Sequence, residues 1–328
     1  MSRLHFLNVL EGDCTIIQHN SSHVSVVDVC NGNSEEDIIK SKAEILAEKY
    51  LIEAGNYNQK ENPVNPISYM SSIGVKSIFR FILTHPDMDH MDGIAKLFDR
   101  FKPRNFWNVR NSKQLDLSKQ NRYSPDDWEF YKQLREAKDS DTFTRLELYS
   151  GSTGKYFNRT EEGNSGGDGI YILSPTKELV SAANDIDDYN DCSYVLLYIS
   201  SNRKILLAGD SHDETWEHII ETHEADVTNV DLLIAPHHGR DSDMDFSFLD
   251  TLNPKVTLFG NAKSKHLAYS SWNNRGLFHI TNNQAGNVIV DINEQECSLY
   301  VTNYKYAKDT NDQTTYSDEH NAYYVGYI

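Results

Sequence analysis

The chain has 328 residues, of which 38% are hydrophobic, and 13 Phe, 19 Tyr and 4 Trp supply large apolar surfaces that exclude a wholly disordered chain. Its 31 basic and 49 acidic side chains give a net charge of −18, which disfavours a general nucleic-acid coat protein, because such proteins bind by neutralising phosphates. The mean hydropathy is −0.60, and no apolar run approaches the roughly 20 residues of a membrane helix.

Three strand-like runs open the chain and predict an antiparallel meander. Polar turns separate these runs, which cover residues 4–10, 14–18 and 24–29. Ser34 and Asp37 then form a capping pattern, and isoleucines and leucines follow at helical spacing. This pattern predicts a helix that ends before Gly55.

Apolar strands and helices continue along the rest of the chain. We expect further strands over residues 77–83, 170–173, 193–199, 204–208, 230–235, 256–259 and 288–292. We expect helices over residues 92–101, 125–137 and 213–222. Strands that come in runs with helices between them predict packed sheets with helices outside, an α/β fold.

One stretch, residues 102–169, is harder to assign because it interleaves basic and aromatic residues and ends in a glycine-rich loop. We interpret it as an α/β insertion or cap within a single domain of residues 1–328, with residues 296–328 as a C-terminal extension. Its aromatic rings could stack on bases while its arginines meet phosphates. The alternative is a cap that packs a small core of its own.

The strongest chemical signal is the motif His85-x-Asp87-x-Asp89-His90, which places four ligand-type side chains directly after an apolar strand. A loop at a strand end can point such side chains into one pocket, where two metal ions about 3.5–4 Å apart could share them. The alternative is a polar turn whose aspartates cap the next helix. Capping does not require two histidines, so the motif favours a metal site.

Two further strand ends carry ligand-type residues. Asp210 follows the strand over 204–208, and its carboxylate could bridge two cations or cap the next helix. His237 and His238 follow the strand over 230–235. Neighbouring side chains in extended backbone point to opposite sides, so we expect only one of the two histidines to bind metal. A pair of exposed loop histidines is the alternative.

Five short segments together resemble the metallo-β-lactamase superfamily, and most closely the soluble hydrolase domain of ComEC-type competence proteins. They are FLNVLEGD at 6–13, VVDV at 26–29, THPDMDH at 84–90, LAGD at 207–210 and PHHG at 236–239. They follow the family's order over about residues 4–295. The resemblance implies an αββα sandwich of two mixed sheets with helices outside, and a metal site along one sheet edge.

The resemblance also implies two divalent ions, Zn²⁺ or Mn²⁺. His85 and Asp87 would hold the first ion, and Asp210 would bridge it to the second. The histidine that usually completes the first site is not visible. Asp191 lies in the corresponding polar segment and is a candidate for that position, with an ordinary turn before a strand as the alternative.

For the second ion, the resemblance implies Asp89 and His90 as ligands, with His237 as the third and His238 as its rival. Asp89 would also have a catalytic role, orienting the attacking water. So many carboxylates beside few imidazoles suit Mn²⁺ and Mg²⁺ better than a histidine-rich site would. The choice between zinc and manganese stays open.

Three residues near these motifs have open roles. His266 follows the strand over 256–259, where related proteins carry a further histidine on a loop near the substrate. It could protonate the leaving oxygen, or it could belong to a solvated basic turn. Asp13 and Asp28 could hold the metal ligands in place or could form turns.

These features predict a metal-dependent hydrolase, a phosphodiesterase or nuclease in which a metal-activated water attacks phosphorus. Its substrate would be a nucleic acid or a nucleotide. One alternative is a hydrolase of small esters, lactones or thioesters. Another is a non-catalytic binding component of a bacterial defence or signalling assembly. Four scattered cysteines without a Cys-x-x-Cys pattern predict a reducing compartment, so we expect a cytoplasmic protein that does not enter membranes.

Overall fold

The computed structural model describes residues 1–35, 57–116, 122–138, 143–262 and 264–328, so the helix predicted after Ser34 lies outside the described residues. The N-terminal meander is confirmed: β1 (Ser2–Phe6) pairs antiparallel with β2 (Thr15–Gln18), which pairs antiparallel with β3 (Val24–Val27). β1 ends earlier than predicted, because the chain turns back after Phe6 and the Leu7 amide donates to the Cys14 carbonyl at 3.1 Å.

The larger sheet extends from this meander in both directions. On one side β3 is followed by three parallel strands, and the last two of these come from residues 102–169. On the other side residues 296–328 supply the outermost strands. In spatial order the ten strands of the described part are β15 (Tyr316–Ser317), β16 (Ala322–Tyr327), β14 (Cys297–Val301), β13 (Val288–Ile292), β1, β2, β3, β4 (Arg80–Ile82), β5 (Asn105–Trp107) and β6 (Thr144–Leu146).

The smaller sheet is also mixed. Its first four strands in spatial order run parallel, and the other two form an antiparallel pair that adds to them. Its six described strands are β12 (His279–Thr281), β11 (Val256–Phe259), β10 (Leu232–Ile234), β9 (Arg203–Leu207), β8 (Val195–Ser200) and β7 (Ile170–Ser174). The carboxyl ends of β9 and β10 therefore lie at the same edge.

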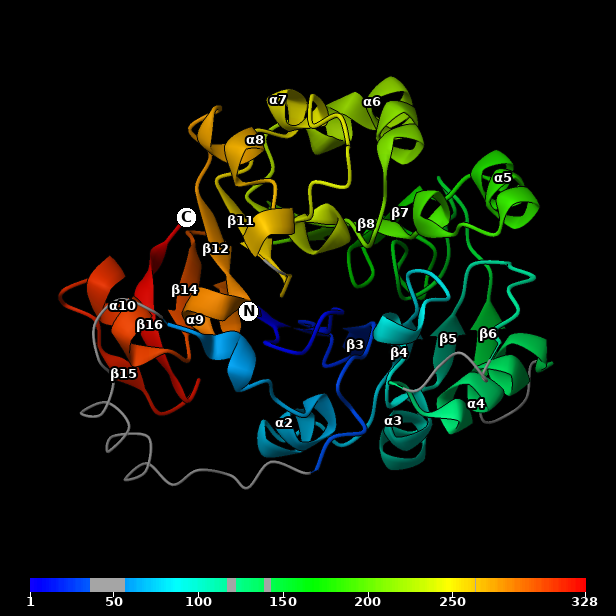
Figure 1. Ribbon diagram of the computed structural model, residues 1–328, viewed down its shortest axis with the longest axis horizontal. Helices are drawn as coiled ribbons and strands as arrows, with labels where there is room; N and C mark the ends of the chain where they lie inside the picture. Colours follow the sequence, from blue (N-terminus) through cyan, green and yellow to red (C-terminus); the bar gives the residue numbers. More distant parts are fainter. Residues whose placement is uncertain (36–56, 117–121, 139–142, 263) are drawn as a thin grey trace.

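Helices cover the outer side of each sheet (Figure 1). The α-helices of the described part are α2 (Pro66–Ser72), α3 (Ile94–Phe101), α4 (Pro125–Glu136), α5 (Lys177–Ile186), α6 (Asp213–Val227), α7 (Phe248–Leu252), α8 (Tyr269–Asn273), α9 (Asn282–Ala285) and α10 (Tyr304–Thr310). Apolar side chains of α2, α3 and α4 pack on the larger sheet, and those of α6, α7 and α8 pack on the smaller one. The predicted αββα sandwich of two mixed sheets is confirmed.

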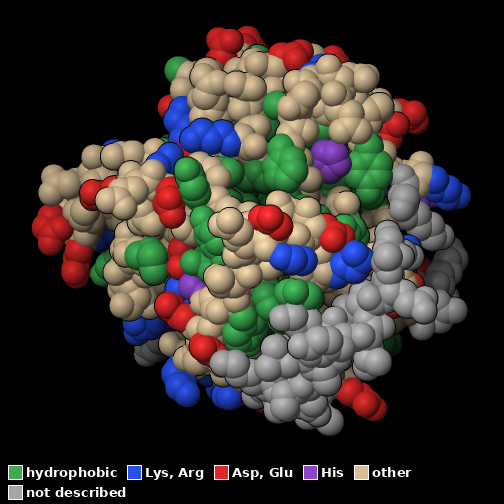
Figure 2. Space-filling model, turned by 90° about the vertical axis from the view of Figure 1, so that its left-hand side faces the viewer, with side chains coloured by type: hydrophobic (Ala, Val, Ile, Leu, Met, Phe, Trp, Pro, Cys, Tyr) green, Lys and Arg blue, Asp and Glu red, His purple; other side chains and the backbone are tan. Residues whose placement is uncertain are grey.

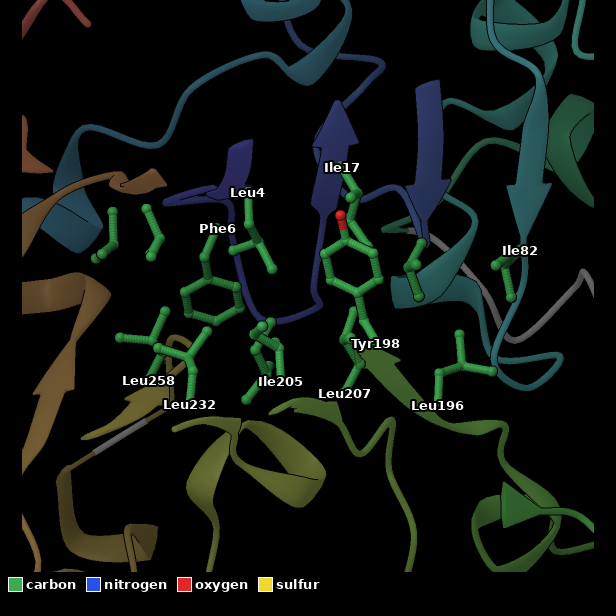
Figure 3. Packing of buried hydrophobic residues seen from close by; sticks show 14 of the residues in the cluster. Leu4, Phe6, Ile17, Ile82, Leu196, Tyr198, Ile205, Leu207, Leu232 and Leu258 are labelled. Atoms are coloured by element: carbon green, nitrogen blue, oxygen red, sulfur yellow. The ribbon is translucent and has the colours of Figure 1, made fainter. Parts of the chain in front are cut away.

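A third apolar layer lies between the two sheets (Figure 3). Leu4 and Phe6 of the larger sheet contribute to it, as do Ile205 and Leu207 of the smaller sheet. Leu206, between the last two, belongs instead to the layer under α6 to α8. Successive side chains of this strand thus pack on opposite faces of the smaller sheet, because side chains of a β-strand alternate between its two faces.

Charges of both signs are mixed on the surface. On the face shown in Figure 2, Asp and Glu side chains lie close to Lys and Arg side chains, with apolar side chains between them. The net negative charge is therefore not gathered into one acidic patch on that face. Among the helices of the described part, none is both long and apolar enough to cross a membrane.

A buried ion pair ties the glycine-rich loop before β7 to the larger sheet. Arg80 of β4 is 1% exposed, and its Nη2 donates to Oδ2 of Asp168 at 2.5 Å. Its Nη1 donates to the Ser25 hydroxyl at 2.8 Å, and His23 contacts the same Asp168 oxygen at 2.8 Å. The arginine therefore supplies much of the positive charge that makes a buried carboxylate tolerable there.

We expect the substitution Arg80→Met to lower the free energy of unfolding by about 3–5 kcal/mol, because it leaves Asp168 buried without its main counter-charge. Urea denaturation measures this loss. Arg275→Met is the matched control, since Arg275 pairs with Asp250 at the surface and exposed pairs contribute little. Equal losses in the two variants would contradict the assignment.

Candidate metal centre

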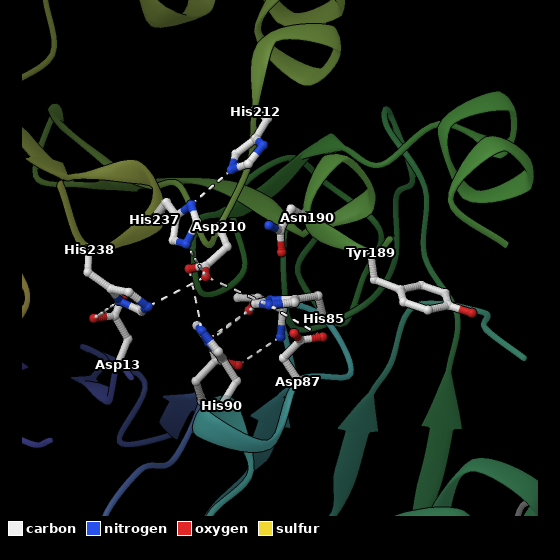
Figure 4. A network of polar contacts seen from close by, with 12 residues as sticks. Asp13, His85, Asp87, His90, Tyr189, Asn190, Asp210, His212, His237 and His238 are labelled. Carbon is white, nitrogen blue, oxygen red and sulfur yellow. Dashed lines mark hydrogen bonds and ion pairs between the residues drawn. The ribbon is translucent and has the colours of Figure 1, made fainter. Parts of the chain in front are cut away.

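The loop that follows β4 presents two buried histidines with fixed ring orientations. Asp28 accepts hydrogen bonds from the Thr84 amide (2.8 Å), the Thr84 hydroxyl (2.7 Å) and Nδ1 of His90 (2.8 Å). Because the Thr84 hydroxyl donates to Asp28, it accepts from Nδ1 of His85 at 3.1 Å. Both rings therefore turn their Nε2 atoms toward Asp210 (Figure 4).

Asp210 is the meeting point of the centre. It follows β9 through Gly209, whose φ of +54° is a conformation that glycine adopts without strain. One carboxylate oxygen of Asp210 lies 3.4 Å from Nε2 of His90, and the other lies 3.8 Å from Nε2 of His85. Asp210 is 4% exposed, so these charges and rings interact with little screening by water.

The two histidines after β10 approach the same carboxylate from the smaller sheet. Nε2 of His238 lies 3.5 Å from Asp210 and Nε2 of His237 lies 3.7 Å from it. Our reasoning from an extended backbone does not apply here, because φ is +48° at His237 and +57° at His238. In this left-handed turn both rings reach Asp210, and His238 is the more deeply buried of the two.

Asp13 completes the centre from the turn between β1 and β2. Its Oδ1 lies 3.0 Å from Nδ1 of His238, so the carboxylate stabilises one orientation of that ring. The turn packs directly on the histidine loop: a Cβ atom at Gly12 would lie 1.8 Å from the carbonyl oxygen of Asp89. Only glycine allows this approach.

Several polar atoms of the centre are buried without a hydrogen-bond partner among the described residues. They include Nε2 of His85, Nε2 of His90, Nε2 of His238 and Oδ1 of Asp210. Leaving such atoms unsatisfied costs about 1–3 kcal/mol each, so their convergence requires an explanation. A bound cation would satisfy these atoms, because imidazole nitrogens and carboxylate oxygens donate their lone pairs to metal ions in protein sites.

Three overlapping groups in the described part have ligand atoms within 4.8 Å of one another. They are His85 with His90 and Asp210, Asp89 with His90 and His238, and Asp13 with Asp210 and His238. Imidazole and carboxylate ligands suit Zn²⁺ and Mn²⁺. The donor set therefore fits a divalent metal ion.

Protons balance the charge of the centre when no cation is bound. Burial disfavours the charged ring of His238, but Asp210 and Asp13 outweigh burial and raise its pKa to about 10. The pKa of His90 is likewise raised by Asp210 and Asp28 against the effect of burial. The pKa of Asp210 lies well below its usual value despite burial, because His238 and His90 favour its charged form.

Two other histidines are neutral and ready to bind metal. Burial, with His90 close by, lowers the pKa of His85 to about 3. Burial lowers the pKa of His237 to about 4, against the attraction of Asp210. Their rings therefore carry no proton to displace near neutral pH.

The structure brings together six of the residues predicted as metal ligands. They are His85, Asp89, His90, Asp210, His237 and His238. Asp87 lies outside the three ligand groups of the described part and pairs with Lys113 at 2.5 Å. His266 is exposed and lies beside the bridge between Arg240 and Leu267.

Asp191, the candidate for the missing ligand, has a structural role here. Its Oδ1 accepts from the amides of His212 and Thr215, and its carbonyl accepts from the Thr215 hydroxyl. These are contacts with the first turn of α6, whose amides have no partner within the helix. Asn190, next to it, turns its amide toward His85 and Asp87 (Figure 4).

Sequence reasoning missed two residues of the site. Nε2 of His212 lies 2.8 Å from Nδ1 of His237, and Lys113 contacts Asp87. The position of His212 two residues after Asp210 could have indicated it. Lys113 lies in the loop after β5, and no local sequence pattern in that loop indicates the site.

Comparison with solved structures finds resemblances of fold. The metallo-β-lactamase fold protein YhfI from Bacillus subtilis is 9% identical with a TM-score of 0.43, covering 85% of this chain and 95% of that protein. A diphosphatase of the PhnP family is 11% identical with a TM-score of 0.41, with the same coverage. CmlA, a diiron β-hydroxylase from Streptomyces venezuelae, is 12% identical with a TM-score of 0.48, and the match covers 89% of this chain and 54% of CmlA.

At the level of sequence, neither a protein-family model nor a curated protein matches the chain.

Binding of a divalent cation should release protons. His238 keeps its proton up to about pH 10, and a ring must lose its proton to bind metal, so affinity should rise with pH. Between pH 8 and pH 6 we expect Mn²⁺ binding to weaken about tenfold per pH unit for each proton displaced. Calorimetric titration in buffers of different ionisation enthalpy counts these protons.

The variant Asp210→Ala lacks the carboxylate that raises the pKa of both rings, so any residual binding should release fewer protons. Affinity that is independent of pH, with no proton release, would show that His90 and His238 are not ligands.

Proposed function

We propose that the protein is a metal-dependent hydrolase that cleaves phosphodiesters, a nuclease or phosphodiesterase related to the ComEC-type hydrolase domains. The observation that carries the proposal is the convergence of buried, unpartnered imidazole nitrogens on Asp210. Structural histidines are normally satisfied by the protein itself. In this centre the unpartnered Nε2 atoms of His85, His90 and His238 all lie within 3.8 Å of Asp210.

Basic side chains around the centre support an anionic substrate. Lys113 lies beside Asp87, Arg122 pairs with Glu11 at 2.7 Å, and Arg240 follows the His237–Gly239 turn. In a chain of net charge −18, these positive groups would offset part of the repulsion that a phosphate meets on approach.

The ligands proposed for the metal are Asp89, His90 and His238, with Asp210 and His85 on the adjoining side. Zn²⁺ or Mn²⁺ fits this set of imidazoles and carboxylates. The chemistry that a divalent cation supplies at such a centre is activation of water for attack and neutralisation of the charge that develops on phosphorus.

The residues of the chain would hold and move protons around that chemistry. Asp28 fixes the ring of His90 through Nδ1, and Asp13 lies against Nδ1 of His238. Asp89 is proposed to orient the attacking water. His266, on the exposed loop beside Arg240, is proposed to give a proton to the leaving oxygen.

Replacing Asp210 by alanine should reduce phosphodiester cleavage by about 100-fold or more and should weaken metal binding, because four histidine rings lose the carboxylate between them. Hydrolysis of single- and double-stranded DNA, RNA and cyclic nucleotides with Mn²⁺ or Zn²⁺ measures the first effect. Metal analysis after dialysis measures the second.

The control is Asp99→Ala, whose carboxylate is 87% exposed on α3 and which should leave both quantities unchanged. Wild-type protein that demonstrably holds metal but cleaves none of these phosphodiesters would overturn the proposal.

The role of His266 makes a separate prediction. His266→Ala should lower kcat about 100-fold for a nucleotide substrate, whose leaving alkoxide needs a proton. It should have little effect on bis(p-nitrophenyl) phosphate, whose leaving group is stable as an anion. Metal affinity should stay as in the wild type. Equal losses on both substrates would show that His266 is not the general acid.

A further inference from the structure

An ammonium group lies beside the carboxylate that the motif predicts as a ligand of the first metal ion. Nζ of Lys113 is 2.5 Å from Oδ1 of Asp87, and the same oxygen is 3.9 Å from Nε2 of His85. The side chain of Lys113 is 17% exposed and that of Asp87 is 36% exposed. The pair therefore lies at the rim of the centre, partly shielded from water.

The loop that carries Lys113 is anchored, so the ammonium is positioned by the protein. Nη1 of Arg135 on α4 donates to the Lys113 carbonyl at 2.9 Å and to Oδ1 of Asn111 at 3.1 Å. The ring of Tyr189 lies 5.2 Å from Nζ of Lys113, within the range of a cation–π contact. A carboxylate, an aromatic ring and a fixed backbone thus surround one cation.

The candidate for the third donor of a metal at Asp87 is used elsewhere. Asp191 is engaged by the start of α6, and its neighbour Asn190 offers only a neutral amide (Figure 4). Within the described residues, Asp87 belongs to none of the groups that could hold a metal ion. By contrast, Asp89, His90 and His238 form one such group beside Asp210.

We infer that the ammonium of Lys113 takes the place of one of the two expected cations, so that the centre holds a single divalent ion on the side of Asp89, His90 and His238. The inference rests on the proposed metal centre and departs from the expectation of two ions. Lys113 neutralises Asp87, and its charge repels a second divalent ion at that carboxylate. One metal ion and one ammonium would then face the substrate together.

The number of bound ions tests this directly. Equilibrium dialysis with Mn²⁺, followed by metal analysis, should give one ion per chain for the wild type and two for Lys113→Met, the second bound more weakly. Electron paramagnetic resonance should show an isolated Mn²⁺ ion in the wild type and a coupled pair in the variant. Circular dichroism checks that the variant is folded.

Three further variants locate the effect. Lys113→Arg keeps the positive charge and should bind one ion. Lys102→Met removes an exposed lysine that pairs with Asp99 and should also bind one ion. The double variant Lys113→Met with Asp87→Asn should return to one ion, which separates binding at Asp87 from an ion elsewhere on the surface.

Two ions in the wild type, or a single ion in Lys113→Met, would overturn the inference. The outcomes also separate it from the proposed function. One ion in the wild type without hydrolysis of any phosphodiester contradicts the proposed function and supports the inference. Two ions in the wild type with hydrolysis support the proposed function and contradict the inference. A wild-type chain that binds no Mn²⁺ contradicts both.

Discussion

A single buried carboxylate sets the charge balance of the centre. Asp210 has imidazole nitrogens of four histidines between 3.4 and 3.8 Å from its oxygens, contributed by loops of both sheets. A buried carboxylate is tolerated only with positive charge beside it. In the chain alone, protons on His90 and His238 provide that charge, and a divalent ion would replace them. Folding and metal binding thus both depend on positive charge beside Asp210, which either protons or a metal ion can supply.

The core places these loops together. Each of the three ligand-bearing strands ends in a residue of the apolar layer between the sheets: Ile82 of β4, Leu207 of β9 and Ile234 of β10. In each case the first ligand lies three residues beyond this side chain, so packing that fixes the sheets against each other also fixes the distance between His85 and Asp210. A site on rigid strand ends is more accurately positioned than one on free loops.

The features that sequence predicts well here are local ones. An apolar run followed abruptly by ligand-type residues identified the ends of β4, β9 and β10, because a buried strand must stay apolar while its end is free to carry function. The order of the motifs also led to the αββα sandwich. Strand bounds were less accurate: β1 stops at Phe6, where an amide of the next turn pairs with Cys14, and apolarity alone does not show that turn.

Ligand assignment depended on what each side chain meets in three dimensions. Asp191 has the chemistry of a ligand, but the amides at the start of α6 reach it. The rule for adjacent histidines assumed an extended backbone, whereas His237 lies in a left-handed turn. Asp87 belongs to the motif, yet its charge is neutralised by Lys113, which lies 26 residues later in the sequence. A motif names the available donors, and competition from amides and ammonium groups decides which of them remain for a metal ion.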